Sequence, residues 1–396
     1  MLRLKKALLG ATVAAAALSA TPASALNIVL NDIGGVTGSQ AELGFRIAAY
    51  YWESVFTNNA TVNLDVGYSN LGPGVLGATG SEIIDFVPIQ SYYNALGETG
   101  NSALDATALA NLSPLSSTGS VQMVVPGYKN NTLRTGIDNE TSRLAPDGQP
   151  ITNTIALLRA NAKALGLATG GTDAEVNFSS TFAFDFDPTN GIAAGQYDFI
   201  GVAIHEIGHA LGFVSGVDDF DYSGDYTGPV DNAWWGYGLD MFRYSANGGG
   251  LSNGPIIDLT PGTASYFSID GGQSAFLNGF FSTGENFGDG NQASHWKAPG
   301  GCTDFLGILN PYICSGQVDS VTALDLALYD AIGWNVNFDI LGNQGYEIST
   351  ASIYRNFFGA AAVPEPASWA MMISGFGLIG SAMRRAKVRK VTFAAA

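Results

Sequence analysis

Residues 198–215 read DFIGVAIHEIGHALGFVS, and the spacing within this stretch decides the fold. Its apolar residues recur at intervals of three, four and five positions, which is typical of a helix with one buried face. Asp198 is placed to cap the N-terminus of that helix, and Gly212 is placed to end it. Because residues four apart are neighbours on a helix surface, His205 and His209 should lie one turn apart on the same face.

Two imidazoles arranged in this way can hold one zinc ion. Glu206 follows His205 directly and would face a water molecule on that metal, whose proton it could take. This is the physical basis of the H-E-x-x-H pattern. The pattern also recurs by chance on ordinary helices, so the alternative at this point is a plain helix that carries two histidines.

The longer string HEIGHALGF, residues 205–213, resembles the zincin metalloproteases, and its Gly212-Phe213 continuation is similar to the metzincin clan. That clan continues the motif as H-x-x-G-x-x-H, whereas Ser215 stands here at the third-ligand position. The resemblance implies an α+β zincin-like fold, with a mixed twisted sheet, an active-site helix and an irregular C-terminal subdomain. It also implies a zinc-dependent metalloendopeptidase that hydrolyses peptide or protein substrates with Glu206 as the catalytic base.

The chain contains three histidines, and His295 is the one outside the helix. Catalytic zinc takes three protein ligands and keeps one open position, so elimination favours His295 as the third ligand. Trp296 follows it, and this resembles the leishmanolysin branch, in which a distant third histidine precedes tryptophan. Asp218 and Asp219 are the alternative ligands; acidic residues in such a loop are also often solvated or bound to structural calcium.

The first 25 residues have the pattern of a secretory signal peptide. A basic start is followed by an apolar run over residues 7–18 and by the small residues Ala23, Ser24 and Ala25. These features predict export and cleavage after Ala25. An N-terminal membrane anchor is the alternative, although the apolar run is short for one.

The C-terminal residues 364–396 resemble the PEP-CTERM sorting signal of Gram-negative bacteria. Pro364-Glu365-Pro366 precedes an apolar stretch over residues 367–383 and the basic pair Arg384-Arg385. The resemblance implies recognition by exosortase-type machinery, transient membrane association through the tail, and a final position at the cell surface or outside the cell. A simple C-terminal membrane anchor is the alternative.

The charge distribution excludes a nucleic-acid partner. The formal net charge is −17, and eight of the 17 basic residues lie in the two terminal segments, so nine remain in the body against nearly all 34 acids. An acidic surface of this kind repels phosphate backbones.

Between the two signals we expect an N-terminal subdomain over residues 26–216, a C-terminal subdomain over residues 217–345 that carries His295, and a linker over residues 346–363. The expected elements are strands near residues 28–30, 62–68, 83–89, 121–125 and 176–186, helices over 40–56 and 152–165, a glycine-rich turn over 72–80 and a polar loop over 130–150. The strand over residues 176–186 offers an edge to which an extended peptide could add, or it is an ordinary strand without that role.

The two cysteines, Cys302 and Cys314, are expected to form a disulfide because the protein is predicted to be exported. The segment between them resembles the Met-turn beneath the zinc of metzincins, with Leu309 where methionine is expected. A closing helix over residues 320–332 follows, with Gly333 as its stop.

A second hypothesis is a surface or extracellular-matrix protein that keeps a zincin fold without catalysis. Ser215, Leu309 and the glycine-rich insertion between the helix and His295 motivate this alternative.

Overall fold

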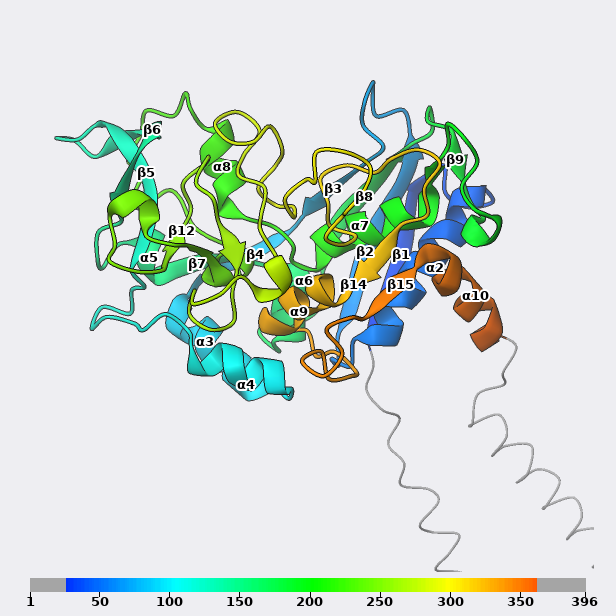
Figure 1. Cartoon of the computed structure of the whole chain (residues 1–396), viewed down its shortest axis with the longest axis horizontal. Coiled ribbons are helices and arrows are strands. Elements are labelled where there is room, and N and C mark those ends of the chain that lie inside the picture. Colours follow the sequence, from blue (N-terminus) through cyan, green and yellow to red (C-terminus); the bar gives the residue numbers. More distant parts are fainter. Residues whose placement is uncertain (1–25, 362–396) are drawn as a thin grey trace, which may run out of the picture.

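The computed structural model describes residues 26–361, and the statements below concern these residues. The predicted signal peptide and the predicted sorting signal lie outside the described residues. Helices and several small sheets alternate along the chain, which confirms the expected α+β class (Figure 1).

A four-stranded mixed sheet supports one half of the molecule. Its order is β1 (Asn27–Gly34), β2 (Thr61–Ser69), β8 (Ala174–Ser179) and β3 (Gly77–Ser81). The first three strands are parallel and β3 is antiparallel. Strands β1 and β3 are the two edges of this sheet, and β8 lies inside it. Strand β3 corrects the predicted glycine-rich turn over residues 72–80.

Two helices pack against each other beside this sheet (Figure 1). They are α2 (Gln40–Val55) and α7 (Phe199–Leu211). A Cβ atom at Gly44 would lie 2.2 Å from the ring of Phe199, so glycine permits the close approach of the two helices. The indole of Trp52 donates a hydrogen bond to the carbonyl of Ile204 at 3.2 Å, which fixes the register of one helix on the other.

A five-stranded sheet supports the other half. Its order is β13 (Tyr266–Phe267), β11 (Arg243–Ser245), β12 (Ile256–Asp258), β5 (Met123–Asn130) and β6 (Thr135–Leu144). The polar loop predicted over residues 130–150 was wrong, because Thr135–Leu144 form strand β6. Because β5 pairs with β12, segments on both sides of α7 share one sheet, and the division predicted at residue 216 does not separate the two halves in space.

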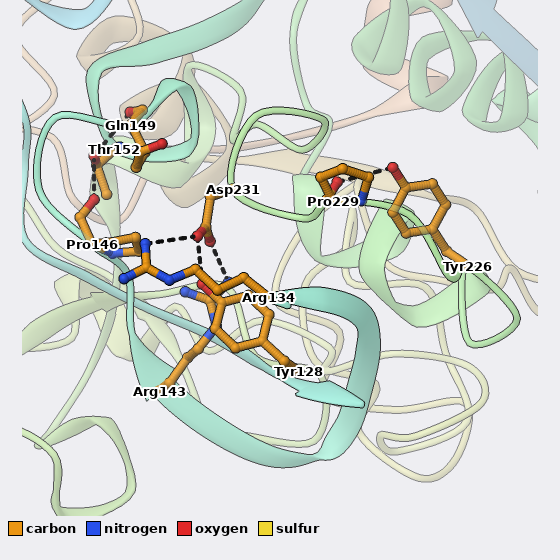
Figure 2. A network of polar contacts seen from close by, with 9 residues as sticks. All are labelled: Tyr128, Arg134, Arg143, Pro146, Gln149, Thr152, Tyr226, Pro229 and Asp231. Atoms are coloured by element: carbon orange, nitrogen blue, oxygen red, sulfur yellow. Dashed lines mark hydrogen bonds and ion pairs between the residues drawn. The ribbon is translucent and has the colours of Figure 1, made fainter. Parts of the chain in front are cut away.

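A polar network anchors the β5–β6 hairpin to the segment that follows α8 (Gly216–Tyr222) (Figure 2). Asp231 accepts hydrogen bonds from the Tyr128 hydroxyl at 2.5 Å and from Nη2 of Arg143 at 2.7 Å. The Arg143 guanidinium also lies 3.7 Å from the centroid of the Tyr128 ring. Burial and the bond to Asp231 raise the pKa of Tyr128 to about 12, so its hydroxyl stays a donor.

The remaining helices and strands complete the two halves. They are β4 (Ile83–Pro88), α3 (Ile89–Thr99), α4 (Ala103–Ala110), α5 (Pro150–Asn153), β7 (Thr154–Leu158), α6 (Arg159–Ala164), β9 (Phe184–Asp185), β10 (Tyr197–Asp198), β14 (Ser320–Thr322), α9 (Ala323–Ala331), β15 (Glu347–Ser349) and α10 (Thr350–Ala361), with short 3₁₀ helices at Pro188–Asn190, Leu239–Phe242, Gly248–Gly250 and Phe276–Asn278.

Two further predictions were wrong. The helix expected over residues 152–165 is split into α5, β7 and α6, because the buried run of β7 pairs with the distant strand β4. The stretch expected as a linker over residues 346–363 contains β15, which pairs with β14, and α10, which packs on α2. Within residues 26–361, no single helix is long and apolar enough to span a membrane.

Candidate metal centre

Helix α7 has the ends that its sequence predicts. The Asp198 side chain accepts a hydrogen bond from the amide of Gly201 at 3.1 Å and caps the first turn. At the other end Gly212 has a φ of +135°, a conformation that favours glycine. The aromatic ring of Phe199 packs against Phe45 and Phe178, so the helix is fixed to the four-stranded sheet from its first residue.

Three imidazole nitrogens meet at one point beside α7. The Nε2 atoms of His205 and His209 are 3.0 Å apart, and the Nε2 atom of His295 lies 3.3 Å from the first and 3.2 Å from the second. Three nitrogens bound to one tetrahedral ion at 2.0–2.1 Å would be separated by about 3.3–3.4 Å. The three side chains therefore have the spacing that a single ion of this size requires.

The other nitrogen of each ring faces a backbone carbonyl oxygen. Nδ1 of His205 lies 2.8 Å from the oxygen of Ile308, and Nδ1 of His209 lies 2.7 Å from that of Phe213. Nδ1 of His295 is 3.2 Å from the oxygen of Gln292. A carbonyl only accepts, so each Nδ1 carries the proton and each Nε2 directs a lone pair inward.

Three lone pairs that face one another repel. A cation that all three nitrogens bind would remove this repulsion. Burial lowers the pKa of His205 to about 3 and that of His209 to about 4, and it lowers the pKa of His295 as well. The imidazoles are thus neutral near pH 7, which is the form that binds metal. The residues present fit a metal ion.

Glu206 lies beside this cluster without joining it. Among the described residues, the ligand atoms that lie within 4.8 Å of one another are those of the three histidines. One carboxylate oxygen of Glu206, Oε2, instead accepts a hydrogen bond from the hydroxyl of Thr79 on β3 at 2.7 Å. Burial raises the pKa of Glu206 to about 7, against the opposing effect of the Thr79 hydroxyl. Among the described residues, Glu206 is therefore not part of the group of ligand atoms.

Asp218, one of the alternative ligands, anchors the segment that carries His295. Its carboxylate accepts hydrogen bonds from the amides of Ala293 and Ser294 at 2.6 and 2.9 Å, and from the Ser294 hydroxyl at 2.5 Å. The Ser294 hydroxyl oxygen in turn accepts the amide of Ser215 at 2.9 Å. Asp218 and the backbone amide of Ser215 therefore hold in place the segment that carries His295.

The neighbouring acids have separate partners. Asp219 accepts a hydrogen bond from the Tyr237 hydroxyl at 3.1 Å, and Asp221 accepts the amides of Asn286 and Phe287, each at 2.8 Å. Within the described part of the chain, no carboxylates gather into a cluster of three or more that could hold structural calcium, one of the roles that the sequence left open for these acids.

The turn that holds His205 is supported by Asp325. This buried carboxylate accepts the amide of Ile308 at 3.0 Å and the indole N–H of Trp296 at 2.8 Å. Leu309 is fully buried, and its methyl groups lie 3.3 Å from where a Cβ atom on Gly208 would be. Asp325 thus links the residue next to His295 with the carbonyl that orients His205.

Thr79 and Asp325 are two residues of the site that the sequence did not predict. Thr79 belongs to no short motif, and the contacts of Asp325 with Trp296 and Ile308 join residues far away in the chain. The capping position of Asp325 at the start of α9 was the available signal for a structural role, since its side chain also accepts the amide of Thr322 at 2.8 Å.

The disulfide between Cys302 and Cys314 is confirmed, and it encloses the turn at Ile308 and Leu309. Its two Cα atoms are 5.9 Å apart. The crosslink therefore restricts the segment whose carbonyl fixes the tautomer of His205.

Comparison with known proteins identifies the C-terminal segment. A family model described as the PEP-CTERM protein-sorting motif matches residues 362–390. No curated protein and no solved structure matches the chain. The motif implies recognition by exosortase sorting machinery, and it shows an exported protein of a Gram-negative bacterium that is sorted to the cell surface or the extracellular space.

Proposed function

We propose that this exported protein is a zinc-dependent metalloendopeptidase of the zincin type. The observation that carries the proposal is the convergence of three Nε2 atoms, all between 3.0 and 3.3 Å apart, from His205, His209 and His295. Three protein ligands with a position left open distinguish catalytic from structural zinc sites.

The donor set favours zinc. Imidazole nitrogen suits zinc, copper, iron and nickel, whereas calcium and magnesium prefer oxygen. All three donors here are neutral imidazoles, and three histidines form one of the known catalytic zinc arrangements. The second partner of each ring is a backbone carbonyl, which fixes the ring orientation before the ion arrives.

Bound zinc supplies Lewis acidity, which lowers the pKa of water toward about 7 and polarises a carbonyl group. With zinc bound, Glu206 would act as the base that takes the proton from a water molecule and would pass it to the leaving amine. Glu206 is 7% exposed as a residue, so bulk water competes little for the proton. Thr79 keeps one carboxylate oxygen occupied and leaves the other available.

Strand β3 provides a place for an extended substrate. It is the last strand of its sheet, it runs antiparallel to β8, and it packs on α7. A peptide that adds to such an edge forms main-chain hydrogen bonds, which recognise a polypeptide without regard to its sequence. The substrate class is therefore an extended peptide or an unfolded segment of a protein.

The test is Glu206→Gln in purified protein loaded with zinc, assayed on casein and on a fluorogenic peptide library. We expect cleavage to fall by about 10²–10⁴-fold, because general base catalysis is lost. Zinc content should stay at one ion per chain. Glu98→Gln, at an exposed position of α3, is the matched control and should cleave like the unchanged protein. Undiminished cleavage by the Glu206 variant would remove the proposed mechanism.

A non-catalytic surface protein is the second candidate. His205, Glu206 and His295 are 6–8% exposed, which also suits an ion that only joins two segments of the fold. In that case zinc would raise the unfolding temperature of the protein, and no peptide in the library would be cut in a chelator-sensitive manner.

A further inference from the structure

We propose that Thr79 is the positioning residue for Glu206, so that the strand offered to the substrate also holds the catalytic base. This inference rests on the proposed function, because positioning matters only if Glu206 moves protons.

The face of β3 that meets α7 is built from alternate residues. Gly77, Thr79 and Ser81 are half-buried, whereas Ala78 and Gly80 are exposed. This alternation follows from the period of two in a strand. The Thr79 hydroxyl donates a hydrogen bond to Glu206, and Ser81 donates one to the carbonyl of His209 at 3.2 Å. Gly77 has no side chain where a Cβ atom would meet Glu206.

The Thr79 hydroxyl is the partner that the structure gives to the Glu206 carboxylate. Its Oγ1 atom lies 2.7 Å from Oε2 of Glu206 and 2.9 Å from the backbone carbonyl oxygen of the same residue. A hydroxyl has one proton to donate, and the shorter of these two contacts is the one to Oε2. The hydroxyl therefore holds Oε2 against β3 and leaves Oε1 to exchange protons.

Gly77 bounds the same carboxylate from another side. A Cβ atom at this position would lie 2.9 Å from Oε1 of Glu206, 3.0 Å from its Cγ and 3.2 Å from its Cδ. Side chains of other residues do not fit there unless Glu206 moves. The carboxylate thus lies between the hydroxyl of Thr79 and the space that the missing side chain of Gly77 leaves open.

This arrangement connects substrate binding with the chemistry. A peptide paired with β3 takes its register from the same backbone that carries Thr79. The distance between the scissile bond and Glu206 is then set by one strand, with no loop between the two.

The main test compares Thr79→Val, which keeps the shape and removes the donor, with Thr79→Ser, which keeps the donor. We expect kcat of the valine variant to fall roughly tenfold to hundredfold, the range that corresponds to loss of a hydrogen bond to a charged group. KM and zinc content should change little. The serine variant should return kcat to within about threefold of the unchanged protein, which a merely structural role of the side chain would not predict.

A second pair of variants tests the space around the carboxylate. Gly77→Ala should lower kcat with zinc retained, because its methyl group displaces Glu206. Gly80→Ala adds the same group to the same strand where no atom lies within 4 Å. A decrease in kcat that both variants share reflects disturbance of strand β3. A further decrease in Gly77→Ala alone reflects the displacement of Glu206.

Crystal structures of the zinc-free and zinc-loaded variants give a readout that does not depend on activity. The Glu206 carboxylate should keep its place in Thr79→Ser and rotate away in Thr79→Val. An unmoved carboxylate, or a valine variant with unchanged kcat, overturns the inference while the proposed function stands. If the unchanged protein cleaves nothing in a zinc-dependent manner, the proposed function fails, and with it the catalytic part of this inference.

Discussion

Each histidine of the candidate centre has one nitrogen committed to a carbonyl and one directed at its two companions. This pairing fixes the tautomers without any acidic partner, since Ile308, Phe213 and Gln292 contribute only backbone oxygens. The neutral rings then add no negative charge to the site, and a bound zinc ion keeps its full charge for the reaction.

His295→Ala tests the third ligand. Removing one of three nitrogen atoms that would contact the ion should weaken zinc binding by more than the roughly 10–100-fold that the loss of an outer partner costs. Competition with a chromophoric chelator measures the affinity directly. A variant that keeps the full affinity would show that His295 is not a ligand.

The sequence predicted the parts of the site that depend on local spacing or on composition. His205, Glu206 and His209 follow from positions on one helix, and His295 follows from the small number of histidines. Thr79 could not be predicted, because its hydroxyl meets Glu206 only after β3 takes its place at the sheet edge.

The segment that carries His295 depends on its anchor at the start of α8. Asp218→Asn keeps the size of the side chain but replaces one acceptor oxygen by an amide that donates, so the bonds to Ala293 and Ser294 cannot all survive. We expect zinc affinity to fall about 10–100-fold, as for other outer partners of metal ligands. Asp219→Asn is the matched control, since Asp219 bonds to Tyr237 instead. Equal losses in the two variants would contradict the anchoring role.

The turn enclosed by Cys302 and Cys314 offers a second test. The double variant Cys302→Ser with Cys314→Ser should lower the free energy of unfolding by about 2–3 kcal/mol, the range for a loop of this length. Because the turn carries Ile308, zinc affinity should fall as well. Thermal unfolding and zinc titration measure the two effects, and a stability loss without any change in zinc affinity would separate the disulfide from the site.

Whole elements were predicted where their signals are local. Helix α7 was predicted with both of its ends, because capping and periodicity are contained within residues 198–212. Strand β7 was mistaken for helix, since its short apolar run Thr154–Leu158 fits both periods and only pairing with β4 decides between them. Strand β6 consists largely of polar residues, so no apolar pattern predicts it. It forms a strand because it pairs with β5.

Several carboxyl groups are buried in the fold, and burial favours their neutral form. Burial raises the pKa of Asp330 from 3.8 to about 7, with the nearby Asp105 adding to the shift. Burial also raises the pKa values of Asp198 and Asp319, which lie close to each other. Such groups bind more protons in the folded chain than in the unfolded one. Their contribution to stability is therefore complete below about pH 4 and is lost as the pH rises through the folded pKa.

Asp330→Asn should remove one part of this pH dependence. An amide can still accept the amide of Val336 through its oxygen, and it stays neutral at every pH. The stability of the variant relative to the unchanged protein should rise between about pH 4 and 7 and then level off, by at most about 4 kcal/mol. Urea unfolding at pH 4.5, 6 and 8 measures this trend. A stability difference that does not vary with pH would show that Asp330 keeps its ordinary pKa in the folded protein.

The three histidines come from two segments that are about ninety residues apart, and the carbonyl that orients His205 lies further along still, at Ile308. A growing polypeptide that ends before His295 has two of the three imidazoles, and the carbonyl of Ile308 that orients His205 has not yet been made. If the protein is a peptidase, its own synthesis is thereby protected, because hydrolytic competence emerges only once nearly the whole domain has been made and folded. For a protein destined to leave the cytoplasm, this delay confines destructive chemistry to the compartment in which folding is completed.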